Sequence, residues 1–385
     1  MQAGEQQELD LSNSDVVTKY KAAAEICNKA IVAVVDACKD GAKVVDVCRI
    51  GDDLIQKEVQ NIFKGKKFEK GIAFPTCVAA NSVVGHFSPL SDDATAIKDG
   101  DLVKIDLGCH IDGWIATQAT TIQVGAGGVA APITGRAADV VAAARTAFDV
   151  AIRMIKPGKK ATEVSEKLAQ AVAPFGCQLV EGVLSHDLKQ FVIDGNKTIL
   201  NRAAPDQKTE DCEFEPNEVY AIDIVVSSGE GKPKVLDEKE TTVYKRALDV
   251  EYKLKMKASR VVLGAVSKKF PMLPFSLRAL TEGEGEDVAE LKKQLRLGLV
   301  ECLTHGLLTP YPVLHEKGGE LVAQIKGTVL LMPNGSDKIT SCPQQPVETD
   351  MKVEDAELIK LLNTGLKTNK KKKKAAAGGE NGAAE

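Results

Sequence analysis

The sequence lacks any long hydrophobic segment, since no apolar run approaches the roughly 18–20 residues that a membrane-spanning helix needs. Its first residues, MQAGEQQELDLSNSD, show no basic stretch followed by an apolar one, as a secretory signal would. The nine cysteines are an odd number and form no CxxC pair, which argues against a disulfide framework or a zinc site. We therefore expect an intracellular protein in a reducing compartment, without membrane insertion.

Motifs of several enzyme classes are also missing. There is no GxSxG element, and the glycine-rich pieces at 125–128 and 229–231 lack the Lys-Ser/Thr of a phosphate-binding loop, so they read as turns. Aromatic residues make up only 4% of the chain, which does not suggest a surface on which unpaired bases stack. The remaining composition, 44% hydrophobic and 27% charged over 385 residues, is typical of a soluble globular protein. A formal charge of only −4 means that any polyanion must bind to local patches.

The rest of the chain is organised around the stretch Asp101–Gly125. It reads as two β-rich runs joined at Asp112-Gly113, a strong signal for a hairpin with a two-residue loop. That turn places Asp106 opposite Ala119, with Thr117 as its diagonal neighbour on the same face, roughly 7–8 Å away. A carboxylate in so apolar a strand is either satisfied by hydrogen bonds or part of an ion or ligand site.

The chain also repeats itself at an offset of 117 residues. KDGAKVVDV (39–47) recurs as KPGKKATEV (156–164), and DLVKID (101–106) recurs as EVYAID (218–223). Between these matches, VVGH ending at His86 is echoed by VLSH ending at His186. Such a duplication predicts two α/β halves related by a pseudo-two-fold axis, with Asp106, Asp223 and the two histidines meeting in a central cleft.

The order of these segments, followed by AQIKGTVLL at 323–331, resembles the type 2 methionine aminopeptidases over about residues 15–333. Within that superfamily the sequence is most similar to the proliferation-associated, ErbB-receptor-binding proteins. The similarity is carried by FPTCVAANSVVGHFSPL (74–90), KIDLGCHIDGWIA (104–116), EGVLSH (181–186) and the final lysine run. The resemblance implies an α/β pita-bread fold with a helical insert subdomain, in a non-peptidase branch of the superfamily.

The same resemblance implies a former metal site whose residues no longer suit two metal ions. Peptidases of this fold hold two metal ions with two Asp, one His and two Glu, and these positions fall on Asp106, Thr117, His186, Asp223 and Lys326. A protonated ammonium cannot coordinate a metal ion. We therefore expect no metal and no cofactor, with a salt bridge of Lys326 to both aspartates in place of the ions. A single ion on Asp106, His186 and Asp223 is the alternative.

Two further cleft positions follow from the resemblance. His86 matches a histidine that contacts substrate in the peptidases, while Asp194 stands where they have a second pocket histidine. Both positions belong to a degenerate cleft that could still hold a peptide.

Composition divides the chain into several parts. Residues 1–12 are polar and 367–385 are low in complexity, so we expect disorder in both. We expect the pita-bread domain at 13–333, the insert subdomain at about 242–316 and a C-terminal extension at 334–366. Helices are predicted from a cap at 13–15 to about 40, and at 44–63, 133–155 and 162–172. In the insert we predict a long basic helix over 242–270 and another helix over 288–304.

Cations gather in the insert, where residues 244–300 contain twelve Lys or Arg against seven Asp or Glu. This excess is either an ordinary solvated helix face or a stripe that binds phosphates. A run of five lysines near the end could be an RNA contact, a nuclear or nucleolar address, or both. The candidate nucleic-acid-binding residues are Lys245, Arg246, Lys253, Lys255, Lys257, Arg260, Lys268, Lys269, Lys370, Lys371, Lys372, Lys373 and Lys374.

Residues 358–362, LIKLL, match the L-x-x-L-L pattern by which short helices enter apolar grooves of transcriptional partners. Leu358, Leu361 and Leu362 either take that role or merely end a helix packed on the domain.

The resemblance and the basic segments lead to one main hypothesis. It is a non-catalytic, monomeric protein that binds structured RNA, rRNA and ribosomes or pre-ribosomes, and regulates growth through ribosome biogenesis and translation. We expect it in the cytoplasm, nucleus and nucleolus. The alternatives are a transcriptional co-regulator with transcriptional or receptor-signalling partners, and an active metalloaminopeptidase.

Overall fold

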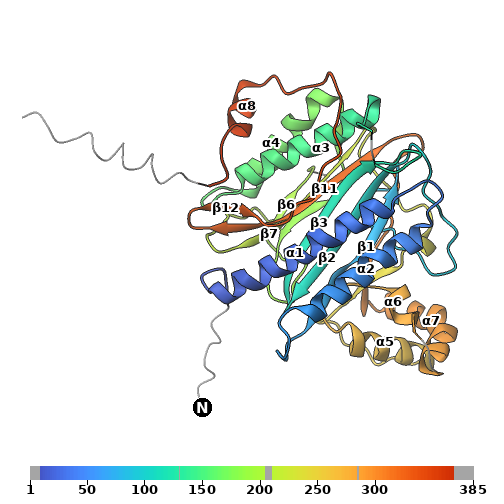
Figure 1. Cartoon of the computed structure of the whole chain (residues 1–385). Coiled ribbons are helices and arrows are strands. Elements are labelled where there is room, and N and C mark those ends of the chain that lie inside the picture. The colour runs from blue at the N-terminus through green and yellow to red at the C-terminus, as the bar shows by residue number, and fades with distance from the viewer. Residues whose placement is uncertain (1–8, 130, 204–209, 284–285, 368–385) are drawn as a thin grey trace, which may run out of the picture.

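The structure, a computed structural model, describes residues 9–129, 131–203, 210–283 and 286–367 (Figure 1). In this part of the chain the larger sheet has nine strands, and its continuous path runs β1-β2-β3-β11-β7-β5-β6. Strand β12 pairs with β11, and β4 pairs with β7. The strands are β1 (Lys70–Ala80), β2 (Leu102–Ile111), β3 (Trp114–Gln123), β4 (Gln178–Leu179), β5 (Leu184–Asp187), β6 (Thr198–Leu200), β7 (Val219–Ser227), β11 (Val322–Met332) and β12 (Gly335–Lys338).

Two pairs of helices cover the two halves of this sheet (Figure 1). Helices α1 (Ser14–Ala37) and α2 (Val44–Asn61) pack on β1, β2 and β3. Helices α3 (Gly135–Met154) and α4 (Ala161–Val172) pack on β7, β11 and β6. The repeat in the sequence therefore corresponds to two similar α/β halves, as predicted.

Local sequence explains how these helices begin and how closely they pack. The Asn13 side chain accepts a hydrogen bond from the backbone N–H of Asp15 at 2.9 Å, which satisfies one of the free donors at the start of α1. In α2, a Cβ atom at Gly51 would lie 2.4 Å from Thr76 Oγ1 and 2.9 Å from Val34 Cγ2. Glycine is thus needed where α2 contacts both α1 and β1.

The predicted hairpin at Asp112-Gly113 is present between β2 and β3. Both loop residues have positive φ, 55° at Asp112 and 77° at Gly113, as the twist of a two-residue hairpin requires. The register pairs Asp106 with Ala119 and Gly108 with Thr117, so the predicted alignment is confirmed.

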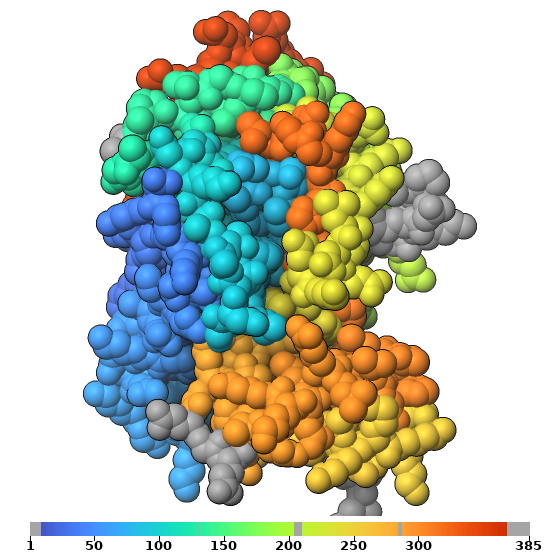
Figure 2. All heavy atoms as spheres, turned by 90° about the vertical axis from the view of Figure 1, so that its right-hand side faces the viewer, coloured from blue at the N-terminus to red at the C-terminus, as the bar shows by residue number. Residues whose placement is uncertain are grey.

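In its described residues, 243–283 and 286–311, the insert forms a second, three-stranded sheet in the order β10-β8-β9, together with three helices. Its elements are β8 (Val243–Arg246), α5 (Lys257–Lys269), β9 (Phe275–Ser276), α6 (Leu277–Thr281), α7 (Glu286–Thr304) and β10 (Leu308–Tyr311). Figures 1 and 2 show these segments together at one end of the molecule. The domain bounds expected from the sequence stay a prediction.

The long basic helix predicted over 242–270 is present only in its second half, as α5, and is wrong over 242–256. The helix predicted over 288–304 is present within α7. The β-prone residues Val243 and Tyr244 pair with both β10 and β9, so strand pairing overrides the helical pattern. The Glu301 carboxylate accepts hydrogen bonds from the backbone N–H groups of Lys255, at 2.8 Å, and Met256, at 3.0 Å. These bonds set the start of α5 at Lys257.

The leucine motif lies in the short helix α8 (Ala356–Leu362), which packs against α3. Leu358 is only 1% exposed and belongs to the core under α3 and α4, and Leu361 and Leu362 pack against the same core. A docking motif needs these leucines to be accessible, so the interpretation as a protein-interaction site fails in this fold. The alternative, a helix packed on the domain, agrees with the structure. Among the described residues, no helix is long and apolar enough to span a membrane.

Candidate functional site

The candidate site is a row of side chains that crosses four neighbouring strands of the large sheet. Asp106 on β2 pairs with Ala119 on β3, Ala119 pairs with Lys326 on β11, and Lys326 pairs with Asp223 on β7. Directly opposed residues of antiparallel strands point to the same face, so the two aspartates and the lysine share one face. The small Ala119 side chain leaves room for Lys326 to reach across β3 to Asp106.

Asp106, Asp223 and Lys326 form one salt-bridged group, which we call the cleft cluster. Lys326 Nζ lies 2.5 Å from Asp106 Oδ2 and 2.9 Å from Asp223 Oδ2. The side chains of the two aspartates are 4% and 11% exposed, and that of the lysine is 9% exposed, so water screens these charges little. The salt bridge expected from the sequence is therefore present.

Charge and burial together determine protonation in the cleft cluster. Two carboxylates face one ammonium group, which leaves one surplus negative charge in a buried site. Burial raises the pKa of Asp106 to about 6, because the attraction of Lys326 does not offset burial and the repulsion of Asp223. Burial by itself would lower the pKa of Lys326, but the two carboxylates outweigh it and hold that pKa above its usual range.

Gln324 belongs to the same site, and the sequence analysis missed it. Its Nε2 donates to Asp223 Oδ1 at 2.9 Å and lies 3.4 Å from Asp106 Oδ2. It stands two residues before Lys326 on β11, so the strand pleat puts both side chains on one face. The position of Gln324, two residues before Lys326 in the predicted strand, could have identified it from the sequence.

The two cleft histidines lie beside the cluster and are neutral at pH 7. Burial lowers the pKa of both His86 and His186, and the positive charge of Lys326 lowers each further. The His86 ring contacts Phe74 and Tyr311, with ring centroids 5.7 and 5.6 Å apart. Lys326 Nζ lies 5.5 Å from the centroid of the Phe74 ring, so aromatic side chains line this end of the cleft.

Asp194 does not extend the cleft cluster but ties the insert to the core. It forms a salt bridge with Lys245 of β8 and accepts a hydrogen bond from the Tyr311 hydroxyl of β10 at 2.6 Å. Burial would raise the pKa of Asp194, but these two partners outweigh it and hold the pKa below its usual range. Lys245, expected at an RNA surface, is thus engaged in an internal salt bridge.

The residues at the family's metal positions do not fit a pair of metal ions. The ammonium of Lys326 binds the same aspartate oxygens that would have to coordinate the ions, and Thr117 offers only an uncharged hydroxyl. In the described part of the chain, no three His, Cys, Asp or Glu side chains are placed to hold a metal ion. Asp106 Oδ1 and Thr117 Oγ1 are buried and have no hydrogen-bond partner among the described residues.

The candidate cations of the insert are spread over α5 and the segment before it. Exposed side chains belong to Lys253, Lys255, Lys257, Arg260, Lys268 and Lys269. Lys257, Arg260 and Lys268 recur at helical spacing and share one face of α5. Lys253 and Lys255 precede the helix instead of continuing it. The run Lys370–Lys374 lies outside the described residues.

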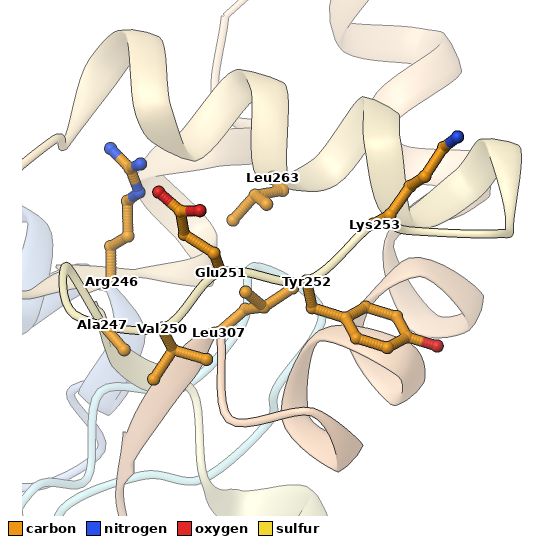
Figure 3. A pocket seen from close by; sticks show the side chains of 8 residues that line it. All are labelled: Arg246, Ala247, Val250, Glu251, Tyr252, Lys253, Leu263 and Leu307. Atoms are coloured by element: carbon orange, nitrogen blue, oxygen red, sulfur yellow. The ribbon is translucent and has the colours of Figure 1, made fainter.

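A hollow of about 550 Å³ lies between this segment and α5 (Figure 3). Its apolar lining includes Leu263 and Leu307, while Arg246 and Lys253 stand at its two ends (Figure 3). Glu251 lines the same hollow (Figure 3). The hollow therefore combines an apolar floor with a cation at either end.

The model of metallopeptidase family M24 matches residues 18–246 of this chain. "ErbB-3 binding protein 1" of Solanum tuberosum is 53% identical over 381 residues, covering 98% of this chain and 95% of that protein. "Proliferation-associated protein A" of Dictyostelium discoideum is 47% identical over 365 residues, covering 94% and 92%. "Curved DNA-binding protein" of Schizosaccharomyces pombe is 40% identical over 368 residues, covering 94% and 93%.

Solved structures show the same kinship. A thermophilic Arx1 superposes with a TM-score of 0.84 at 30% identity, covering 92% of this chain and all of that one. The methionine aminopeptidase of Thermotoga maritima gives a TM-score of 0.56 at 19% identity, covering 86% and 98%, which confirms the predicted pita-bread fold. The chain therefore belongs to metallopeptidase family M24 and, within it, to the group of ErbB-3 binding and proliferation-associated proteins.

Proposed function

We propose that this protein is a non-catalytic, RNA-binding growth regulator that associates with ribosomes or pre-ribosomes. The observation that carries the non-catalytic part is Lys326, whose ammonium bridges Asp106 and Asp223. Peptide hydrolysis in this fold needs metal ions that activate water, and an ammonium group cannot replace them. The names of the relatives, which refer to growth and receptor binding, support a growth-related role.

The nucleic-acid part of the proposal rests on the charge of the insert. Residues 244–300 carry five more cations than carboxylates, in a chain whose formal charge is −4. Lys257, Arg260 and Lys268 lie on one exposed face of α5, so they can meet phosphates at helical spacing. The hollow between Arg246 and Lys253 lies beside them. The relative named for binding curved DNA is consistent with a nucleic-acid partner.

Two of the candidate cations contribute differently from what the sequence suggested. Lys245 pairs with Asp194, and Lys269 Nζ lies 3.4 Å from the carbonyl of Leu280. Arg260 is exposed, although its Nη1 also donates to the carbonyls of Leu254, at 3.0 Å, and Lys255, at 2.9 Å. We therefore assign the phosphate contacts mainly to Lys253, Lys255, Lys257 and Lys268, with Arg260 beside them. Structured RNA is the expected ligand, because the exposed cations of the insert can meet phosphates. A chain that is only 4% aromatic offers few side chains on which unpaired bases could stack. Under this proposal the protein is monomeric and works in the cytoplasm, nucleus and nucleolus.

The test is an RNA gel shift together with ribosome co-sedimentation across a salt series. Changing Lys253, Lys255, Lys257 and Arg260 to Gln should weaken binding and flatten the salt dependence by about 0.7–0.9 in log K per log salt for each lost contact. The matched control changes four exposed lysines elsewhere, Lys39, Lys43, Lys98 and Lys156, to Gln. If both variants bind like the wild type at every salt concentration, the insert is only a solvated basic surface.

A further inference from the structure

A hollow of about 1090 Å³ lies at the start of β7, next to helix α1 and the loop after β5. We call it the acidic hollow, because four carboxylates and two ammonium groups are among the side chains that line it. These charged residues are Asp10, Asp187, Glu215, Glu218, Lys189 and Lys197. The excess of two negative charges favours a cationic occupant.

The chain segment that leads into the acidic hollow adds further negative charge. Residues 210–218 contain five carboxylates and no lysine or arginine. Lys197 forms salt bridges to the last two of these carboxylates. Glu210 and Glu213, which precede them, are exposed. The surface beside the hollow therefore continues its negative charge.

The described chain ends close to this hollow, beside β12 (Figure 1). The backbone N–H of Ser336 on β12 donates to the carbonyl of Leu366 at 3.1 Å, and Lys367 Nζ lies 3.1 Å from Asp337 Oδ1. The same carboxylate pairs with Lys21 of α1 at 3.2 Å. Lys21 directly follows a residue of α1 that lines the hollow, so the end of the described chain and the hollow meet at one helix.

The hollow and the end of the described chain also share one face of the large sheet. Val219, which lines the hollow, pairs with Leu330, and Leu330 pairs with Asp337. Directly opposed residues of antiparallel strands point to the same face. Asp337 and its partner Lys367 therefore stand on the face where the hollow lies.

Strand pairing also gives the distance that the lysine run, Lys370–Lys374, has to cover. Asn217 lines the hollow and donates its backbone N–H to the carbonyl of Leu331 at 2.8 Å, and Leu331 pairs with Ser336. Leu366 follows beyond Ser336, so three strand spacings, about 14 Å, separate it from Asn217. An extended chain advances about 3.3 Å per residue, which places the run about 13–26 Å along the chain from Leu366. Its lysines can therefore reach the hollow.

We propose that the acidic hollow is a docking site for the protein's own lysine run. The ammonium groups of the run meet the carboxylates of the hollow and of residues 210–218. The short tether beyond Lys367 holds the run near the hollow at an effective concentration on the order of millimolar, which favours this contact over one between two molecules. RNA that binds the run competes with the hollow for the same cations, so docking lowers the RNA affinity. The contact itself does not depend on the proposed RNA binding.

Carbodiimide cross-linking of the full-length protein tests the contact, because this reagent joins a carboxylate to an amine only where the two touch. After digestion with a protease that does not cut at lysine, mass spectrometry should find the lysine run joined to residues 210–218 or to Asp10. A mixture of unlabelled and nitrogen-15 protein separates links within one molecule from links between two. Links only between molecules would make a second copy the occupant. That result, links only to carboxylates elsewhere, or no links would overturn the proposal.

The rate at which trypsin cuts the lysine run gives an independent measurement, because docking shields the run. The test variant neutralises four exposed carboxylates of the site: Asp10→Asn, Glu210→Gln, Glu213→Gln and Glu215→Gln. The matched control neutralises four exposed carboxylates elsewhere: Asp36→Asn, Asp53→Asn, Asp92→Asn and Glu166→Gln. Cleavage should be about tenfold faster in the test variant, since four surface ion pairs of ordinary strength together hold the run by that factor.

The control variant should be cut at the rate of the wild type. Equal rates in the test and control variants would contradict docking in the acidic hollow. Neither measurement involves RNA, so a failure of the proposed RNA binding would leave both results as they stand.

Discussion

Lys326 determines the charge balance of the cleft. It neutralises one of two buried carboxylates and makes a salt bridge to each of them. Lys326→Met would leave Asp106 and Asp223 facing each other without a cation. We expect the free energy of unfolding at pH 8 to fall by about 3–5 kcal/mol, as for other buried pairs that lose one partner.

Chemical denaturation measures this loss. The same change at the exposed Lys98 is the control and should stay within about 0.5 kcal/mol of the wild type. A loss below about 1 kcal/mol for Lys326→Met would mean that the salt bridges contribute little to folding.

The pKa of Asp106 predicts how stability changes with pH. Its folded-state pKa, raised to about 6 from 3.8, means that the folded protein holds a proton which the unfolded chain has released. Stability contributed by this group is therefore lost as pH rises from about 4 to about 6. In Lys326→Met the carboxyl pKa should rise further, because the opposing cation is gone. The destabilisation caused by this variant should be smaller at pH 5 than at pH 8, and equal losses at both pH values would contradict the assigned surplus charge.

The metal content of the purified protein tests whether the cleft has lost its metal ions. Purified protein should contain no stoichiometric divalent metal and should not release methionine from a methionyl peptide, even after metal is added. The double variant Lys326→Glu, Thr117→Asp restores two carboxylates at the family's ligand positions, and we expect it to bind divalent ions without gaining turnover. Two bound ions or peptide turnover in the wild type would refute the loss of chemistry in the cleft.

At the scale of elements, the main contact within the insert is the packing of α5 on α7. A Cβ atom at Gly298 would lie 2.5 Å from Val262 Cγ2 and 2.7 Å from the Ala258 carbonyl oxygen, so the helices cross at this glycine. Gly298→Ala should force them apart, costing about 1–3 kcal/mol of local stability.

Hydrogen exchange can localise this effect. Protection should fall in α5 and α7 and stay unchanged in β2 and β7. Gly264→Ala is a matched control on the same helix pair, because a Cβ there meets nothing within 4 Å, and it should leave protection equal or higher. A uniform loss of protection across the sheet would show that the insert does not open on its own.

At the scale of the whole molecule, two basic segments act within a chain of net charge −4. Neutralising Lys370–Lys374 should lower RNA affinity and reduce its salt dependence, and neutralising the four insert cations should do more. The reason is that the folded insert, with Lys257 and Arg260 on α5, holds its cations in fixed positions, so ordering them on binding costs less. Gel shifts of the two variants in parallel test the ranking, and the reverse order would move the main RNA contact from the insert to the lysine run.

Much of this protein followed from the sequence by itself. The repeated segments predicted the two α/β halves, and Asp112-Gly113 predicted the hairpin that aligns Asp106 with Ala119. Family motifs predicted that Lys326 stands at one of the family's metal-ligand positions. These features are local or are carried by a motif, so a single segment contains the information for each.

Other features were decided by the tertiary structure alone. The donation of Gln324 to Asp223, the salt bridge of Lys245 with Asp194 and the burial of Leu358 all join segments that lie far apart in the chain. Strand pairing of Val243 and Tyr244 likewise overrode a helical pattern. The physical reason is that such contacts depend on how whole elements pack, and neither the period of a segment nor its composition specifies which distant side chain will face it.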